Sequence, residues 1–486
     1  MKRRLLSLLL ATLSLVAVLS GEEWSLQRAI DRALTVNHEL LSRQKHIDYL
    51  KAEKSTALTK YFPRLNLNLS YTKLNDPIVL DLDPMRNLLI ALQTQDKLSD
   101  LDTQMLLKSG RFLTAQERSV YSQAISTAIG NVIPNLDMTL LDQNVFRTNI
   151  ELFQPIWIGG KIQALNRGAS LQVQEGTEEL LISREAVLEE TSRIYFLNKL
   201  LEAVVDIHRK AEEGIRLHYK RAEDLYRSGL VAKYQLLRAK VAHSEAQKNL
   251  KNSEDNLTTA RTVLRNLLEL PDNAEVTTTT PLKYLPKSEK SGEVWSRVEA
   301  NNGTLKKLEI KKALVKVKKK ADLAEYLPQI YAFGRYEIAK DDLSLLDPEW
   351  AVGVGVKLNL FSSGEKIFKM QADNRLIQEV EEKKKEVVTL LKSLSDKLYY
   401  EADAKKNSLE TYPTRLEEAE ENLKLADSRF STGLGISLEV VDAHLMLQKI
   451  QTEELQALYE YNLSWLKIHG LFQNTAEIIS QWEAQK

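Results

Sequence analysis

The chain of 486 residues is long enough to bury large hydrophobic cores. Its 67 basic and 67 acidic side chains give a formal net charge of +0 at pH 7, so no overall field favours nucleic acid or an acidic substrate. The sequence contains no cysteine, which excludes disulfides, thiolate metal sites, thiol nucleophiles and a lipid anchor on an N-terminal cysteine.

The first segment has the pattern of a secretory signal peptide. Residues 1–4 are MKRR, a largely apolar run follows from Leu5 to Leu19, and small residues stand at Ser20 and Gly21. The run is shorter than the roughly 20 apolar residues that span a bilayer as a helix, and a membrane anchor or a buried helix is the alternative. We predict a signal peptide over 1–20 and an exported chain, because no later stretch is apolar for long enough to form a transmembrane helix.

The first repeat, residues 21–270, begins with a helical pattern over about 22–60. The period then changes to two, which predicts a strand with one apolar and one polar face over about 63–73. A second alternating segment predicts a strand over about 146–156, and Gly159-Gly160 turns the chain after it. The apolar positions of the first strand are Leu65, Leu67, Leu69 and Tyr71.

Very long helices follow. The stretch from Lys161 to Arg227 has no proline and predicts a helix about 100 Å long. After a turn near Gly229, a second helix with strict 3–4 spacing of apolar and small residues runs to about residue 268, which is typical of a coiled coil. A linker rich in threonine and proline occupies residues 271–291. The seam of the second helix is Ala239, His243, Ala246, Leu250, Ser253, Leu257, Ala260, Leu264 and Leu267.

The second repeat, residues 292–471, has the same order of elements. It predicts a helix, strands over about 329–338 and 350–360, and a long helical hairpin that turns near Gly433. Pro413 lies in its first long helix and is expected to kink it. Residues 472–486 form a C-terminal tail.

The spacing of the repeats locates an insertion. Pro328 follows Pro63 by 265 residues, whereas Gly364 follows Gly160 by only 204. The difference of 61 residues therefore lies in the loop that joins the first pair of strands, and that loop contains a helix-like stretch over 85–107. We expect this loop to be a variable surface loop or a cap.

The strand pairs have the length and alternation of outer-membrane β-strands, and a soluble β-hairpin is the alternative. An exposed sheet edge cannot lie in lipid, and four strands are too few to close a barrel. If these strands span lipid, the protein is an obligate oligomer, with eight strands in a dimer or twelve in a trimer. The sequence leaves this choice open.

The chain closely resembles the TolC-type outer-membrane efflux protein family (outer membrane factors) over essentially the whole mature sequence. Individually weak motifs carry the resemblance through their doubled order and spacing. They are a Tyr-x-Pro before a strand, Gln154-Pro155 before Gly159-Gly160, and the hairpin ends Gly229-Leu230 with Ala239 and Gly433-Leu434 with Ala443.

This resemblance implies a mainly helical fold with a membrane β-barrel part and a two-fold repeat of helix–strand–strand–helix. The family's trimers have a twelve-stranded barrel in the outer membrane and a twelve-helix tunnel that extends far into the periplasm. Members are passive exit ducts of efflux pumps or type I secretion systems, and they dock through their helical ends onto a periplasmic adaptor and, through it, an inner-membrane pump. The resemblance therefore implies a homotrimer in outer-membrane lipid that is not an enzyme.

The family also implies a periplasmic gate. Members carry acidic residues six and nine positions after the second tip glycine, and here these are Glu439 and Asp442. Three copies of each would form carboxylate rings that favour cations. The equivalent positions of the first hairpin hold Gln235 and Arg238, and we expect Arg238 to pair with either carboxylate on a neighbouring hairpin.

The chain departs from the family's gate at two positions. Phe430 stands where an aromatic residue with a hydroxyl is usual, and Gly435 stands at a usually basic position. The simpler interpretation of Glu439, Asp442 and Arg238 is that they are solvated charges near a helix start. The hairpin ends predicted to meet the adaptor are Ser228, Gly229, Leu230, Thr432, Gly433 and Leu434; the simpler alternative is a plain helix–helix turn.

Catalysis and cofactor binding find no support in the sequence. The seven histidines include no pair at helical spacing for zinc, Gly159-Gly160-Lys161 lacks the rest of a phosphate loop, and no Gly-x-Ser-x-Gly occurs. The lysines of residues 306–320 have no aromatic partners and indicate a solvated helix face rather than a nucleic-acid site. The competing hypothesis from another class is a soluble periplasmic coiled-coil protein of the adaptor or scaffold type, which would need no strands of membrane length.

Overall fold

The computed structural model describes residues 22–287, 289–344 and 347–484. The signal-peptide prediction for residues 1–20 lies outside them. The chain divides into two compact units, which are described separately. A helical unit contains the described residues up to Ala57 and those of Gln163–Lys320 and Ile367–Lys486, and a sheet unit contains Leu58–Ile162 and the described residues of Ala321–Lys366.

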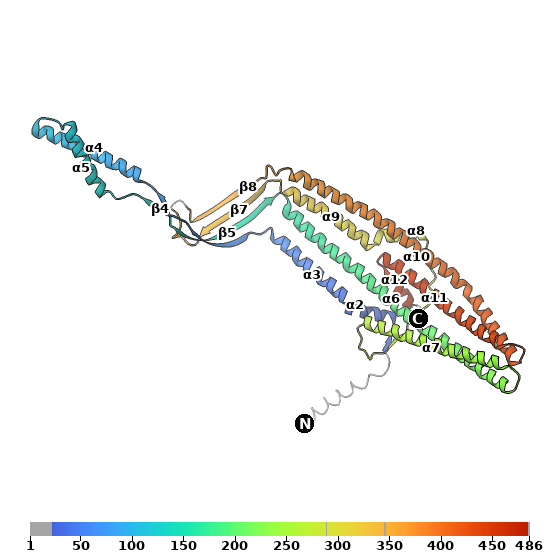
Figure 1. Cartoon of the computed structure of the whole chain (residues 1–486). Helices are drawn as coiled ribbons and strands as arrows, with labels where there is room; N and C mark the ends of the chain where they lie inside the picture. The colour runs from blue at the N-terminus through green and yellow to red at the C-terminus, as the bar shows by residue number, and fades with distance from the viewer. Residues whose placement is uncertain (1–21, 288, 345–346, 485–486) are drawn as a thin grey trace, which may run out of the picture. The chain divides into compact units, whose positions relative to one another are not determined.

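Two helical hairpins dominate the helical unit (Figure 1). The first consists of α6 (Lys161–Arg227) and α7 (Lys233–Leu267), and the second of α10 (Glu365–Ser431) and α11 (Ser437–Leu471). Pro413 lies inside α10, which continues on both sides of it, so the helix loses one backbone hydrogen bond there without ending. The buried positions of α7 all belong to the predicted seam: Ala239, Ala246, Ser253, Leu257, Ala260 and Leu264.

The N-terminal helical segment is interrupted where the sequence predicted one helix. Strand β1 (Glu22–Trp24) comes first, followed by α2 (Leu26–Val36) and α3 (His38–Thr59). Asn37 ends α2 with an extended conformation, and its side-chain Oδ1 accepts a hydrogen bond from the N–H of Leu40 at 3.1 Å. Its side chain thus caps the start of α3, which makes this break a local effect of one asparagine.

The main core gathers the short elements around the middle of the long helices. Strand β1 pairs in parallel with β6 (Val276–Thr278), which lies within the expected linker. The hydroxyl of the fully buried Tyr195 donates to the Trp24 carbonyl at 2.7 Å and accepts from the N–H of Thr280 at 2.8 Å. Residues 276–280 of the expected linker are therefore fastened to the core by backbone and side-chain hydrogen bonds.

Two short helices complete this core. They are α8 (Ser291–Asn301) and α12 (Thr475–Ala484), and α12 forms within the expected C-terminal tail. The hydrophobic core cluster includes Val294 of α8 and Ile478 and Trp482 of α12. Burial of these side chains fixes α8 against α11, and α12 against α11 and α2.

The lysine-rich helix α9 (Gly303–Ala324) is matched by acidic residues on the long helices. Lys312 and Glu381 approach to 2.8 Å, and Lys318 lies 2.7 Å from Asp373, a buried carboxylate on α10. Lys307 also pairs with Glu179 of α6. Several lysines of this helix thus form ion pairs with neighbouring helices.

The sheet unit is built on four antiparallel strands in the order β2-β5-β7-β8 (Figure 1). Their bounds are Arg64–Lys73, Asn144–Ile158, Gln329–Glu337 and Trp350–Lys357. Strands β2 and β8 form the two edges, and neither pairs with a further strand among the described residues. The fold class is therefore as predicted: mainly helical with a β part, and with helix–strand–strand–helix occurring twice along the chain.

The register of the strands sorts the side chains into two different faces. Partner positions place Leu67 of β2 beside Ile150 of β5, Ile150 beside Tyr336 of β7, and Tyr336 beside Trp350 of β8. One face is therefore apolar across all four strands. Its members are Leu65, Leu67, Leu69, Tyr71, Phe146, Thr148, Ile150, Leu152, Gln154, Ile330, Ala332, Gly334, Tyr336, Trp350, Val352, Val354 and Val356.

The opposite face is polar except near the helical ends of the strands. Asn68 donates to Asn149 across two strands at 3.0 Å on this face. Nearer the helical ends of the strands, the rings of Phe333 and Tyr331 lie over the glycines Gly353 and Gly355 of β8. A Cβ at Gly353 would come within 2.8 Å of the Phe333 ring, so this glycine makes room for the aromatic ring.

The insertion between β2 and β5 is a helical hairpin on a short ribbon. Strands β3 (Ile78–Leu80) and β4 (Met138–Leu141) pair, and α4 (Asp83–Ser109) and α5 (Ala115–Val132) follow between them. The sequence predicted α4 but not α5, although Thr114 and Glu117 form a reciprocal capping box at its start. Among the described residues, no helix combines the length and apolarity needed to cross a bilayer.

Candidate functional site

Both long hairpins turn in the same way. Gly229 and Gly433 have φ angles of +71° and +77°, a region that glycine enters without steric cost. The N–H of Leu230 donates to the Leu225 carbonyl and that of Leu434 to the Arg429 carbonyl, each at 2.9 Å. Each helix therefore ends in a Schellman motif. An added Cβ at either tip glycine would meet nothing within 4 Å, so the backbone conformation alone requires glycine there.

The predicted tip residues divide into capping and exposed groups. The hydroxyl of Ser228 donates to the Asp224 carbonyl at 3.0 Å, and that of Thr432 to the Arg429 carbonyl at 3.0 Å. Leu230 and Leu434 are 68% and 78% exposed. The hydroxyl residues thus finish the helices, and the leucines form the outermost apolar surface of each turn.

The second turn is tighter than the first. The N–H of Gly435 also donates to the Arg429 carbonyl, at 3.0 Å, and a Cβ on Gly435 would lie 2.9 Å from the Phe430 nitrogen. The equivalent residue of the first hairpin, Val231, is buried. The absence of a basic residue at position 435 therefore follows from crowding by backbone atoms.

Phe430 packs between the hairpins. It is fully buried, and its ring centroid lies 4.6 Å from that of His218 on α6. The other buried members of its cluster are small or β-branched residues of all four helices, and such side chains allow the helices to approach closely. This cluster consists of Ala222, Ala239, Ala426, Phe430, Val440 and Ala443.

Polar contacts also join the two hairpins. Gln235 of α7 accepts a hydrogen bond from the N–H of Ser437 at 3.2 Å, and the Ser437 hydroxyl lies 2.8 Å from Nε2 of His218. Ser437 is the first residue of α11, whose start has no side-chain cap of its own. Gln235 therefore completes the start of α11 from the neighbouring hairpin. Further along, Arg221 donates to both carboxylate oxygens of Asp427, at 2.6 and 2.7 Å.

Two histidines lie within this contact. Burial is the main cause that lowers the pKa of His218 to about 4, and the nearby His444 adds to it. Burial likewise lowers the pKa of His444, whose ring stands so close to Gly214 that a Cβ there would lie 2.4 Å from it. Both histidines are therefore neutral at neutral pH.

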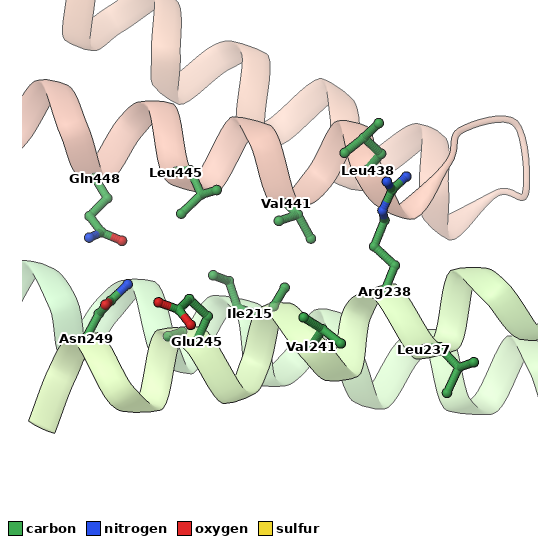
Figure 2. Close-up of a pocket in the computed structure, with 12 residues that line it drawn as sticks. Ile215, Leu237, Arg238, Val241, Glu245, Asn249, Leu438, Val441, Leu445 and Gln448 are labelled. Carbon is green, nitrogen blue, oxygen red and sulfur yellow. The ribbon is translucent and has the colours of Figure 1, made fainter.

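The acidic pair and Arg238 lie on the exposed surface near these contacts. Glu439 and Asp442 are exposed, and Glu439 approaches Arg429 of its own hairpin to 3.9 Å. Arg238 extends from α7 toward Leu438 of α11 at the end of an apolar cleft (Figure 2). It forms no ion pair with the part of the chain that the structure describes, so its pairing with Glu439 or Asp442 of a neighbouring hairpin stays a prediction. The cleft is also lined by Ile215, Leu237, Val241, Val441 and Leu445.

Sequence reasoning missed His218, His444, Arg221 and Asp427. One signal was present: His218 precedes the first tip glycine by 11 residues, and His444 follows the second by 11. Because the two hairpins lie side by side and turn at the same end, equal separation from the turns places His218 and His444 at the same level along the helix axes. The two histidines lie on different helices, so the i, i+3 or i, i+4 spacing of a zinc-binding helix does not relate them.

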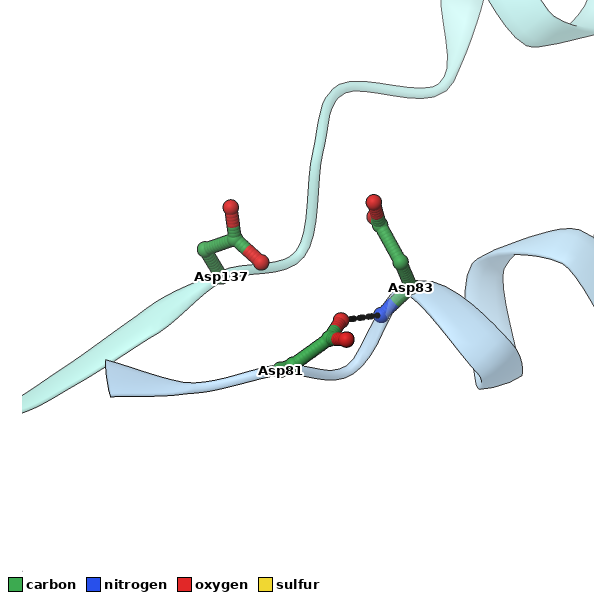
Figure 3. A group of neighbouring side chains, drawn as sticks. All are labelled: Asp81, Asp83 and Asp137. Carbon is green, nitrogen blue, oxygen red and sulfur yellow. Dashed lines mark hydrogen bonds between the residues drawn. The ribbon is translucent and has the colours of Figure 1, made fainter.

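One acidic group lies elsewhere, at the base of the insertion. Asp81, Asp83 and Asp137 lie close together, with ligand atoms within 4.8 Å of one another (Figure 3). Asp81 Oδ1 accepts a hydrogen bond from the N–H of Asp83 at 2.9 Å, which caps the start of α4. Helix capping accounts for the position of Asp81, and we assign no metal role to the group.

Comparison with known proteins agrees with this architecture. Residues 294–471 match the sequence model of a family described as outer membrane efflux protein. The resemblance to the outer membrane efflux protein family is confirmed. The match covers the second repeat from α8 to the end of α11, including the tip at Gly433. No curated protein sequence matches the chain.

Solved structures extend the likeness in fold to nearly the whole chain. The outer membrane protein VceC of Vibrio cholerae has 14% sequence identity and a TM-score of 0.65, with 92% of this chain and 96% of VceC covered. CusC, described for its transmembrane channel formation, has 13% identity and a TM-score of 0.69, with 94% and 95% covered. The CmeC outer membrane channel of Campylobacter jejuni has 13% identity and a TM-score of 0.65, with 94% and 89% covered. The chain therefore shares the fold of these outer-membrane proteins over nearly its whole length.

Proposed function

We propose that the protein is a passive exit duct in the outer membrane, and that three copies form it. The supporting observation is the sheet, which has one largely apolar face, interrupted by Thr148 and Gln154, and two edges that pair with no further strand among the described residues. Leu65, Leu67 and Leu69 on β2, like Val352 and Val354 on β8, are all exposed. A surface of this kind is disfavoured in water and suits a lipid environment.

One end of the apolar face carries aromatic residues. Tyr71, Phe146, Tyr336 and Trp350 are exposed and lie where the four strands enter the outer loops. Aromatic side chains concentrate at membrane–water interfaces, and outer-membrane barrels have such girdles. A strand of ten residues such as β2, tilted as in a barrel, spans about 25 Å, the height of an outer-membrane apolar band.

Closure of the sheet then requires other copies of the chain. In lipid, the free edges of β2 and β8 must pair, and pairing β2 of one copy with β8 of the next gives a ring. Three copies supply twelve strands and, from α6, α7, α10 and α11, the twelve long helices of a periplasmic tunnel. A soluble adaptor or scaffold protein, the alternative function, has no use for an apolar sheet face with free edges.

A matched pair of substitutions tests the membrane assignment. Leu69 and Ser70 are adjacent on β2 and lie on the apolar and polar faces. On a lipid-facing strand, Leu69→Arg costs about 2–4 kcal/mol near the bilayer midplane, whereas Ser70→Arg faces the lumen. We expect Leu69→Arg to reduce the amount of detergent-extracted trimer and Ser70→Arg to leave it near the wild-type level. Equal levels for the two variants, or a wild-type protein released by salt as a monomer or dimer, would refute the proposal.

We further propose that the ends of the hairpins form the periplasmic gate and dock an adaptor of a tripartite efflux or type I secretion system. Glu439 and Asp442 lie three residues apart on one exposed side of α11, so trimerisation would place two carboxylate rings at the aperture. The exposed leucines of both turns offer the adaptor an apolar contact, and the adaptor links the duct to an inner-membrane pump. In this assembly Arg238 pairs with a carboxylate of the adjacent subunit.

Single-channel recording tests the gate. The Glu439→Ala/Asp442→Ala variant is expected to lose cation selectivity and block by divalent cations, because the rings provide the negative field. A variant at an exposed carboxylate far from the tip, Asp206→Ala on α6, serves as the control. Unchanged selectivity and block in the double variant would remove these residues from the gate.

A further inference from the structure

The helix α4 carries an apolar stripe that no described residue of the chain covers. Met85, Leu88, Leu89 and Leu92 are 62%, 59%, 46% and 56% exposed. Their spacing of three and four residues places them on one side of the helix over its first turns. Such a stripe is the usual interface of a helix that packs against another helix.

The stripe faces away from the partner helix α5. The residues that α4 buries include Ile90 and Thr94, which lie about 140° and 180° around the helix from Met85 at 100° per residue. By contrast, the exposed large apolar residues of α5 are Val120, Tyr121 and Val132, which do not follow the spacing of a stripe and lie among exposed polar residues such as Gln123 and Thr127. The hairpin thus has an apolar outer side on α4 and a more polar one on α5.

The hairpin is rigidly built, so this stripe is a defined surface. The carboxylate of Asp102 on α4 pairs with Arg118 on α5 and accepts a hydrogen bond from the N–H of Leu113 at 3.0 Å. Arg86 donates to the Gly130 carbonyl at 2.7 Å and so joins the base of α4 to α5. These contacts lie at both ends of the hairpin and hold the two helices together.

We propose that the apolar stripe of α4 packs against the same stripe of the other two copies, so that three α4–α5 hairpins form a helical cap over the outer mouth of the duct. This inference rests on the proposed trimer. The hairpin joins β2 to β5 at the end of these strands away from α3 and α6, and the β3–β4 ribbon continues from their pairing. Because β2 is an edge strand, each hairpin stands beside the junction between two copies.

The dimensions agree with this arrangement. Twelve tilted strands spaced about 4.8 Å apart close into a barrel with a wall about 12 Å from its axis. Two packed helices are about 8–10 Å apart between their axes. A hairpin that rises from the rim with α5 outside therefore brings α4 close to the axis, where three stripes can meet.

The energetics need only a small interface. Four side chains per copy would be a weak contact between free proteins. The barrel, however, already holds the three hairpins together, so their association is intramolecular at a high effective concentration. Burial of the four exposed side chains then stabilises the cap, and the entropic cost of bringing separate molecules together has already been met by the barrel.

The lack of cysteine allows a direct test, because every introduced thiol is unique. We compare Leu92→Cys on the stripe with Gln93→Cys, an exposed neighbour about 100° away around the helix. On mild oxidation of membranes, we expect Leu92→Cys to form a disulfide-linked dimer of two of the three copies and Gln93→Cys to form none. Adding Leu88→Asp to Leu92→Cys should abolish the dimer, whereas Asn87→Asp, an exposed change of equal charge off the stripe, should not.

The mass of the detergent-extracted protein separates the two levels of the proposal. If the protein is a trimer and Leu92→Cys crosslinks no better than Gln93→Cys, the cap is wrong and the duct stands. If Leu92→Cys instead joins a different protein, the stripe has another occupant and the cap is equally wrong. If the protein is not a trimer, the proposed function itself fails.

Discussion

Acidification should loosen the contact between the two hairpins through His218. The unfolded-state pKa of a histidine is 6.5, and burial lowers that of His218 to about 4. The contact is therefore fully stable above pH 6.5 and loses stability as the pH falls toward 4, because the state with separated hairpins binds the proton more readily. The full effect of this pKa difference is about 3 kcal/mol, and about 2 kcal/mol of it is lost by pH 5.

This loss is large enough to measure at the hairpin ends. About 2 kcal/mol corresponds to a roughly 30-fold increase in the opening equilibrium between about pH 8 and pH 5. Hydrogen–deuterium exchange of the first turns of α11, corrected for the intrinsic pH dependence of exchange, reports this equilibrium. Single-channel open probability at the two pH values provides a second readout.

Substitution by glutamine isolates the histidine. His218→Gln keeps a side chain that can bond to Ser437 but cannot gain a proton, so most of the pH dependence should disappear. His444 is also buried and has a lowered pKa, so His218→Gln/His444→Gln should remove the remainder. Asp427 and Arg221 face His218 with opposite effects on its pKa and stay unchanged in both variants. An exposed histidine on α3, His46, provides the control substitution. A pH dependence in His218→Gln equal to that of the wild type would refute the reasoning.

Three other predictions follow from contacts at the hairpin ends and in the sheet. Gly435→Ala should destabilise the second turn by about 1–3 kcal/mol, because the added Cβ meets backbone atoms that cannot move aside. We expect faster hydrogen exchange confined to this turn, and unchanged exchange would contradict the prediction. A double-mutant cycle of Arg221→Ala and Asp427→Ala should give a coupling of about 0.5–1 kcal/mol in the same exchange assay, since one guanidinium nitrogen contacts both carboxylate oxygens but the pair is partly exposed. Additive effects of the two substitutions would rule the pair out as a link between the hairpins. Gly355→Ala should lower the yield of assembled protein, because the added Cβ would lie 2.5 Å from the Tyr331 ring. Adding Tyr331→Ala should restore part of that yield, and failure of this rescue would show that the ring is not the obstacle.

The strands could be predicted because their evidence is local. The alternation of leucine and asparagine over residues 65–69 shows both the two-residue period of a strand and which side of that strand is apolar. The observed strand is Arg64–Lys73. The break at Asn37 was missed because the apolar period of helix continues across it. Only the side chain of Asn37, through its bond to Leu40, decides where the second helix starts. Helix α5 was missed for a related reason, since its apolar residues are sparse and its start depends on a capping box.

The contacts between the hairpins could not be predicted from one chain's periodicity. Gln235 and Arg238 were selected together by position, yet Gln235 bonds to Ser437 and Arg238 lies beside an apolar cleft. The difference depends on how α7 is rotated about its axis relative to α11. A heptad pattern shows which side of a helix is apolar, but it does not fix that rotation to better than about one residue. Phe430 was expected near the aperture, and its place inside the alanine cluster depends on the small residues that the other helices bring to the same level.

The hairpin contact has a strength that suits opening by an adaptor. Its polar links are the ion pair of Arg221 and the two hydrogen bonds of Ser437, each worth about 1 kcal/mol or less, so together they contribute about 3 kcal/mol. Exposing Phe430 as well would add about 2–3 kcal/mol. A closed end that is about 6 kcal/mol more stable than an open one stays shut unaided. An adaptor that bound only the open form, through Leu230 and Leu434, would shift this preference by RT ln(1 + [L]/Kd), where [L] is its effective concentration beside the duct. Reversing about 6 kcal/mol therefore requires an effective concentration on the order of 10⁴ times the Kd, which a tethered, multivalent adaptor can supply, whereas the pH effect of His218 alone would not reverse the preference.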